Sequence, residues 1–142
     1  MTSIFLLLSF AMVTGYYYLQ QPTIIINKKT ITVEVARTWE EHRRGLSSRD
    51  NLADNTGMLF LFDDINSQIF FNQDMKFPIK VIWVTGDKIV GISDLPIDQG
   101  ENTLVHSPEA IDKVLEISNQ TFENTNIKNG EQIKIRNVKK TK

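Results

Sequence analysis

The chain has 142 residues, a formal net charge of −1 from sixteen basic and seventeen acidic side chains, and no cysteine. Its length allows one domain and leaves no room for a large multidomain enzyme. The balanced charge argues against a nucleic-acid-binding protein. The missing cysteine excludes disulfides, thiolate zinc sites, iron–sulfur clusters and a cysteine nucleophile. With two histidines, a histidine metal site would need most of its ligands from carboxylates.

The N-terminal segment is apolar, and no charged side chain precedes Lys28. Residues 4–13 read IFLLLSFAMV and three tyrosines follow at 16–18. An apolar run of about ten residues is too short for a spanning helix but fits the hydrophobic region of a secretory signal. The tyrosines, which favour the membrane interface, bring the uncharged stretch close to the length of an anchor. We therefore expect residues 1–21 to be a signal peptide or a membrane anchor.

Two features argue against a signal peptide: no basic residue precedes the apolar run, and Val13-Thr14-Gly15 lacks the Ala-x-Ala cleavage pattern. The alternative is a buried N-terminal helix, although so apolar a segment needs a larger core than this chain offers. Export predicts an extracytoplasmic protein that is secreted, periplasmic or anchored to the cytoplasmic membrane by residues 4–19. One domain is expected at residues 22–138, followed by a disordered basic tail at 139–142.

The domain begins with a predicted β-hairpin. Residues 23–26 and 30–36 are its strands, because isoleucine and valine alternate with polar residues in the second of them. After Gly57, the apolar run at 58–62 is typical of a strand buried on both faces, and Asp63-Asp64 is expected to end it.

Between these strands the sequence predicts a short helix. Thr38 and Glu41 have the spacing of a capping box, in which each side chain bonds the other's backbone N–H. The helix is expected to run to about Leu46, with Trp39 and Leu46 on its inner side.

Short β-type runs fill most of the remaining sequence. Strands are predicted at residues 68–71, 79–84, 88–93, 103–105 and 132–136. Ser107-Pro108 has the signature of a helix start, and the following residues 111–115 suit a helix, although 114–118 also suits a strand. The fold class is therefore mostly β: a compact antiparallel sandwich or squat barrel with one or two short helices.

The order of motifs resembles a known family. Residues 35–49 (VARTWEEHRRGLSSR) and 57–62 (GMLFLF) are similar to the V-A-x-T-x-x-E-x-x-x-G-L-M-x-R and G-M-L-F-x-F motifs of the domain of unknown function 192. Residues 70–79 (FFNQDMKFPI) lie where that family has F-W-M-K-N-T-x-I-P-L. Ser107-Pro108 and residues 114–116 match later positions, as does Asn129-Gly130-Glu131. The resemblance covers about residues 30–135.

The resemblance implies a mostly antiparallel β-domain, often behind an export signal or anchor, without an established activity. It also implies a strand at 114–118 and a short helix near 121–126, which we adopt over the helical interpretation. The chain departs from the family at Ser47, at residues 72–75, at Lys80 and at Gln120. A site built by the central motif would therefore be altered here.

Four polar residues outside the apolar strands are candidates for a binding site. Arg49 can present its guanidinium to a carboxylate or a sugar hydroxyl, or it can pair with an acid such as Glu41 or Glu116. Asn72, Gln73 and Asp74 follow two phenylalanines, and amides beside aromatic rings suit a polar ligand such as a glycan. The simpler interpretation makes Asp74 part of a loop turn.

Glu116 is the fifth candidate, because it interrupts an apolar strand. A buried carboxyl there would have a raised pKa and could act as an acid or base, whereas an outward-facing one would be solvated. His106 lies beside Ser107, but no third member of a triad is evident. His42 is expected on a solvated helix face. The aspartates at 50–64 do not fit the calcium-loop template, so neither metal nor cofactor is predicted.

These features favour a non-catalytic envelope domain that binds a polar ligand, such as a glycan, through residues 72–75 with Arg49 nearby. One alternative is a hydrolase of envelope polymers that uses Asp74 and Glu116 as a carboxyl pair, about 5 to 9.5 Å apart. Another is a purely structural or interaction module. The expected partners are the membrane, if the N-terminal segment is retained, and a small polar molecule or glycan; no nucleic acid is expected.

Overall fold

The computed structural model describes residues 21–139. Its elements are β1 (Thr23–Ile26), β2 (Lys29–Ala36), α2 (Trp39–Arg44), β3 (Thr56–Asn66), β4 (Ile69–Phe71), β5 (Ile79–Thr85), β6 (Lys88–Leu95), β7 (Leu104–His106), β8 (Ile111–Ser118), α3 (Asn119–Thr125) and β9 (Lys134–Arg136). The predicted signal or anchor lies outside the described residues, apart from its last position. Among the described residues, no helix is long and apolar enough to cross a membrane.

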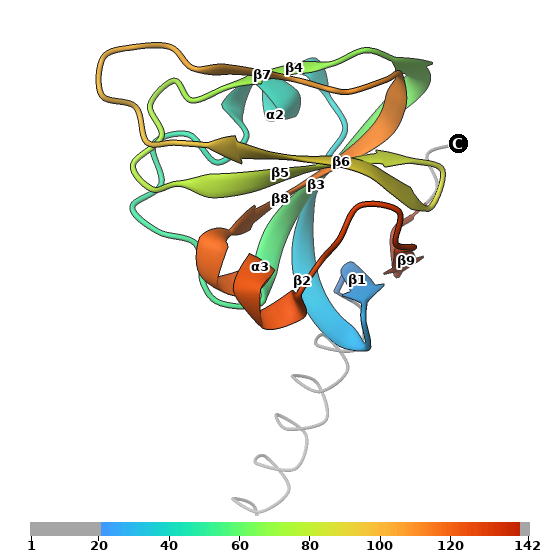
Figure 1. Cartoon of the computed structure of the whole chain (residues 1–142). Coiled ribbons are helices and arrows are strands. Elements are labelled where there is room, and N and C mark those ends of the chain that lie inside the picture. Colours follow the sequence, from blue (N-terminus) through green and yellow to red (C-terminus); the bar gives the residue numbers. More distant parts are fainter. Residues whose placement is uncertain (1–20, 140–142) are drawn as a thin grey trace, which may run out of the picture.

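A seven-stranded sheet with the order β6-β5-β8-β3-β2-β1-β9 forms the body of the domain (Figure 1). Neighbouring strands are antiparallel except β2 and β3, which are parallel. A parallel pair needs a crossover connection, and the segment that carries α2 supplies it. The sheet curls, and the two-stranded sheet β4-β7 lies beside α2 at one end of the molecule (Figure 1). For residues 21–139, the predicted mostly β fold with one or two short helices is confirmed.

Two hydrophobic clusters lie on opposite faces of the sheet, because side chains alternate along each strand. Leu59 and Leu115 belong to one cluster, against which Phe122 of α3 packs. Phe60 and Val114 belong to the other, against which Phe70 of β4 packs. The expected burial of β3 on both faces is confirmed for residues 57–60. The second cluster matters for function because it surrounds the candidate site.

The position of the helix predicted after Thr38 is confirmed, but its end and the orientation of Trp39 differ from the prediction. Thr38 and Glu41 form both bonds of the capping box, and α2 ends at Arg44, before Gly45. Leu46 is buried as expected, but Trp39 is 70% exposed, so its predicted inward orientation is wrong. Trp39 is the first residue of a six-residue helix in which no residue is buried, and a helix this short does not bury a whole face. Asp63-Asp64 does not end β3, which continues to Asn66 through an irregular pairing with β8.

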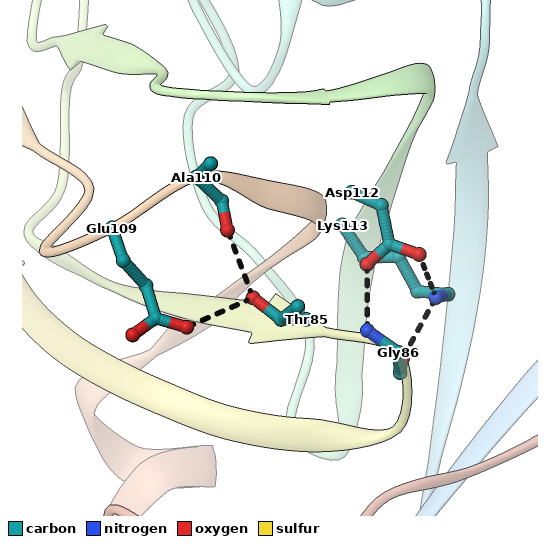
Figure 2. A network of polar contacts seen from close by, with 6 residues as sticks. All are labelled: Thr85, Gly86, Glu109, Ala110, Asp112 and Lys113. Atoms are coloured by element: carbon teal, nitrogen blue, oxygen red, sulfur yellow. Dashed lines mark hydrogen bonds and ion pairs between the residues drawn. The ribbon is translucent and has the colours of Figure 1, made fainter.

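The helix start suggested by Ser107-Pro108, which we set aside in favour of the strand implied by the family resemblance, is absent, and long-range polar contacts hold this segment instead. The Ser107 hydroxyl accepts from the Gln68 backbone N–H at 3.0 Å, and its own N–H donates to the Gln68 carbonyl at 2.9 Å. Further on, the Thr85 hydroxyl donates to the Ala110 carbonyl at 3.1 Å (Figure 2). The Ser107 hydroxyl, which would have capped a helix, thus links the residue after β7 to the residue before β4.

The same network fixes the beginning of β8 against the β5–β6 turn. The Asp112 carboxylate accepts from the Gly86 backbone N–H at 2.9 Å, and Lys113 Nζ donates to the Gly86 carbonyl at 2.7 Å (Figure 2). The strand and helix that the family resemblance implied are confirmed as β8 and α3. Ser118 caps α3 by accepting from the Thr121 backbone N–H.

Candidate functional site

Glu116 lies near the C-terminal end of β8, which is an interior strand of the sheet between β5 and β3. It pairs with Met58 of β3 and with Val81 of β5, and only 4% of its surface is exposed. Its Oε2 atom is buried and has no hydrogen-bond partner. Of the two alternatives left open by the sequence, the structure shows the buried one. A buried carboxyl without a partner is costly, so this position needs an explanation beyond packing.

An open cavity of about 280 Å³ lies over Glu116, between α2 and the β4-β7 sheet. It is lined by Trp39, His42, Arg43, Arg44, Gly45, Leu46, Ser47, Phe60, Phe62, Gln68, Ile69, Phe70, Phe71, Met75 and Glu116; we call this the Glu116 cavity. Most of its wall is apolar or aromatic, and Trp39, Ile69 and Phe71 remain exposed around it. Concave, mostly apolar surfaces with a few polar groups are typical of small-molecule sites.

Burial controls the charge of Glu116. Removal from water raises the pKa of its carboxyl to about 8, and the positive charge of Arg49 opposes that rise only in part. At neutral pH the unliganded carboxyl is therefore mostly protonated.

Arg49 does not neutralise Glu116, because it is already paired. Its guanidinium donates two hydrogen bonds to the Glu34 carboxylate, at 2.6 and 2.8 Å. This pairing lowers the pKa of Glu34 and raises that of Arg49. Glu34 and Glu116 both pair with Met58, from opposite sides, so the three share one face of the sheet. The partner of Arg49 is thus Glu34, rather than the Glu41 or Glu116 considered from the sequence.

Gly45 lets the backbone pass close to the buried carboxyl. It has φ +46° and ψ −132°, a conformation that side chains disfavour. A Cβ at this position would lie 3.4 Å from Phe60 Cζ and 3.7 Å from Glu116 Oε2. The glycine at the end of α2 therefore keeps open the space beside the carboxyl.

The residues of the loop predicted to bind ligand, Asn72 to Met75, differ in their environments. Asn72 is buried: its side-chain amide donates to the Ile97 carbonyl at 3.0 Å and accepts from the Thr103 N–H at 2.8 Å. Gln73 and Asp74 line a second cavity of about 360 Å³ beside the first. Asp74 has φ +58°, and its N–H donates to the Asp98 carboxylate at 2.9 Å.

Asn72 thus holds loops together, and this role can be tested. Replacing Asn72 by alanine would leave two part-buried backbone groups, the Ile97 carbonyl and the Thr103 N–H, without their side-chain partner. We expect N72A to lose about 2 kcal/mol of unfolding free energy. Urea unfolding measures it, with Gln73→Ala, at the exposed neighbouring position, as the matched control. Equal stability of the two variants would contradict the structural role of Asn72.

The structure does not gather the predicted residues around one cavity. Glu116 lines the first cavity, Gln73 and Asp74 the second, and Arg49 a third beside β2. The first two cavities adjoin, because residues such as Ser47 and Phe71 line both. The described residues contain no cluster of histidine and carboxylate side chains suited to a metal ion.

The sequence interpretation missed the aromatic wall. His42, expected on a solvated face, is half-buried, and its ring centroid lies 4.7 Å from that of Phe62. Its Nε2 lies 3.1 Å from the Ala36 carbonyl oxygen. Phe60 and Phe62 are two residues apart in one strand, which places them on one face. The two-residue spacing of Phe60 and Phe62 could have indicated an aromatic face. Which face holds the cavity, however, depends on the pairing of β3 with β8.

Comparison with known proteins identifies the family. The profile of the domain of unknown function 192 (DUF192), described as an uncharacterized ACR, matches residues 23–135. The chain belongs to the DUF192 family. All residues that line the Glu116 cavity fall within the match. No curated protein matches this DUF192 chain.

Two solved structures are similar to this DUF192 domain. One is a protein of unknown function from Novosphingobium aromaticivorans DSM 12444, with 25% identity, a TM-score of 0.70 and coverage of 80% of this chain and 83% of that one. The other, from Sinorhizobium meliloti 1021, is described as a candidate transcription regulator, with 20% identity, a TM-score of 0.73 and coverage of 83% and 94%. They support the fold and assign no activity to it.

Proposed function

We propose that this DUF192 domain is a non-catalytic binding module whose small-molecule ligand occupies the Glu116 cavity. The observation that carries the proposal is the buried Glu116 carboxyl, whose Oε2 has no partner at an open cavity. A ligand that contacts this oxygen would relieve the cost of burying it.

The walls indicate the kind of ligand. Phenylalanine rings and the exposed Trp39, Ile69 and Phe71 offer apolar contact, while Glu116 is the buried acid among the polar residues of the lining. Such a site suits a small molecule with an apolar body and one hydrogen-bond donor. Amines with an alkyl body meet this description, whereas sugars, the glycan class expected from the sequence, bring several hydroxyl donors and meet it less well.

A binding role is supported better than hydrolysis by a carboxyl pair. Among the described residues that line the cavity, Glu116 is the only carboxylic acid. Asp74, the expected second carboxyl, lines the adjoining cavity and is exposed. Hydrolysis by paired carboxyl groups needs both at one bond of the substrate.

The location of the domain is also a proposal. It rests on the apolar run at residues 4–13 and the tyrosines after it, which favour a signal or anchor. The module would then bind its ligand outside the cytoplasm. A phosphatase that is active only outside the cytoplasm, fused after Gln21, would be active in cells if this is correct and inactive if it is not.

The binding function can be tested by screening the protein for ligand-induced thermal stabilisation. The screen uses a panel of small sugars, amines, amino acids and carboxylic acids. We expect at least one compound to raise the melting temperature of the wild type. Glu116→Leu should abolish that rise and Asp74→Asn, in the adjoining cavity, should preserve it. Loss in D74N with retention in E116L would place the site elsewhere, and no stabilisation by any class would favour a structural module.

A further inference from the structure

We propose that the Glu116 cavity binds its ligand through a positively charged ammonium group, so that the module recognises small organic cations. This inference rests on the binding function proposed above and adds the ligand class. It follows from three observations: the aromatic side chains that line the cavity, its single unpartnered acid, and the pairing of Arg49, whose charge acts on that acid, with Glu34.

Aromatic rings surround the space above the acid. Phe60 and Phe70 meet edge to face, with centroids 4.9 Å apart and an interplanar angle of 82°. His42 and Phe62 lie on the same cavity with centroids 4.7 Å apart. The faces of aromatic rings carry partial negative charge and attract cations, most strongly where water is excluded. A ring-lined pocket with a carboxylate is a recurrent solution for binding ammonium groups.

The acid supplies the opposite charge. Glu116 is the only carboxyl among the described cavity-lining residues, and its Oε2 is an unused acceptor. An ammonium group beside it would favour the ionised carboxylate, and the proton of Glu116 would leave to solvent. At a carboxyl as buried as that of Glu116, a charged contact is stronger than one to a neutral hydroxyl. A cation therefore gains more from this carboxyl than a sugar does.

The other charged groups near the cavity permit a cation. The guanidinium of Arg49 is held by Glu34 at 2.6 and 2.8 Å, which offsets much of its repulsion. Arg43 and Arg44 also line the cavity, where the guanidinium of Arg43 lies over the Trp39 ring, 5.4 Å from its centroid. Arg43 and Arg44 are exposed, so solvent and salt screen their charge. His42 is the remaining titratable group that lines the cavity.

Matched pairs of probes test the ammonium requirement. Choline is compared with 3,3-dimethyl-1-butanol, in which a carbon atom replaces the charged nitrogen, and n-butylammonium with 1-butanol. Binding to the full chain is measured by calorimetry or by chemical-shift titration. We expect at least one cation to bind about tenfold or more tightly than its neutral partner. Its affinity should rise about tenfold per pH unit from pH 6 until Glu116 is ionised near pH 8, because binding expels the proton.

Two variants complete the experiment. Glu116→Gln should lose this selectivity and its pH dependence, while Asp74→Asn should keep both. If neither cation binds more tightly than its neutral partner, the ammonium inference is overturned. In that case, a sugar from the screen that binds the wild type but not E116L would leave the binding function standing. The absence of every ligand class would remove the binding function itself.

Discussion

Replacing Glu116 by glutamine is expected to abolish a loss of stability that the wild-type domain undergoes between pH 5 and pH 9. Burial raises the pKa of Glu116 to about 8, against 4.5 for an ordinary glutamate. Between these two values the folded protein holds a proton that the unfolded chain has released. The unfolding free energy therefore falls as the pH rises through this window. At about 1.4 kcal/mol per pKa unit, the total loss is several kcal/mol.

Glutamine has nearly the same shape and cannot ionise, so E116Q should show no such loss. Urea unfolding of both proteins across the window measures the difference, and contributions that both proteins share cancel in it. The acids whose pKa values are lowered, such as Glu34, Asp50 and Asp98, act at lower pH and do not interfere. We expect similar stability at pH 5 and a clear advantage of E116Q at pH 9. Parallel curves for the two proteins would show that Glu116 is not held protonated by burial.

Replacing Gly57 by alanine is expected to be the most damaging single-methyl change in the sheet. A Cβ there would lie 2.6 Å from the Glu116 carbonyl oxygen and 2.9 Å from Ile117 Cγ2. The first contact is with backbone in the neighbouring strand, which cannot move without breaking the pairing of β3 with β8. We expect G57A to lose about 2 to 3 kcal/mol of unfolding free energy and to melt about 10 °C lower.

Gly91 provides the matched control for this prediction. A Cβ there would lie 2.7 Å from Pro108 Cγ, 3.1 Å from Pro108 Cδ and 3.1 Å from Trp83 Cδ1; all three are side-chain atoms, and the shortest contact is with Pro108. G91A should therefore be destabilised too, but Pro108→Ala in the same chain should restore much of the loss, since it removes the two proline atoms. No comparable second change should rescue G57A. Thermal melting of the four proteins tests the contrast, and a G57A protein as stable as the wild type would refute the close approach of β3 to β8.

Local patterns predicted those elements whose interactions are local. The β1–β2 hairpin follows from alternating isoleucine and valine, and the α2 cap follows from the spacing of Thr38 and Glu41. The helix-start pattern at Ser107-Pro108 was misleading, because the Ser107 hydroxyl accepts a hydrogen bond from Gln68, thirty-nine residues away, instead of from its own segment. Sequence spacing contains no information about such a distant partner. The resemblance to the DUF192 family, rather than the local pattern, led to the correct strand and helix at β8 and α3.

Of the candidate site, the sequence could predict Glu116 but not the residues that surround it. An acid within an apolar strand marked Glu116, but whether it faced the core or solvent depended on how β8 pairs with β3 and β5. The Arg49–Glu34 ion pair joins residues fifteen positions apart on β2 and on the loop after α2. Asn72 looked like a ligand-binding amide because buried structural amides and exposed binding amides have the same residue type. Its environment, which the sequence does not contain, separates the two.

The most direct test of this account is the titration of the Glu116 carboxyl itself. The side-chain carbonyl ¹³C resonance of Glu116, assigned by its absence from E116Q, is followed from pH 4 to pH 10 with and without the best-binding cation. We expect a midpoint near pH 8 in the free protein and a lower midpoint when the cation is bound, because the ligand stabilises the carboxylate. A midpoint near 4.5 that the ligand does not move would contradict both the buried, unpartnered state of Glu116 and its role in binding.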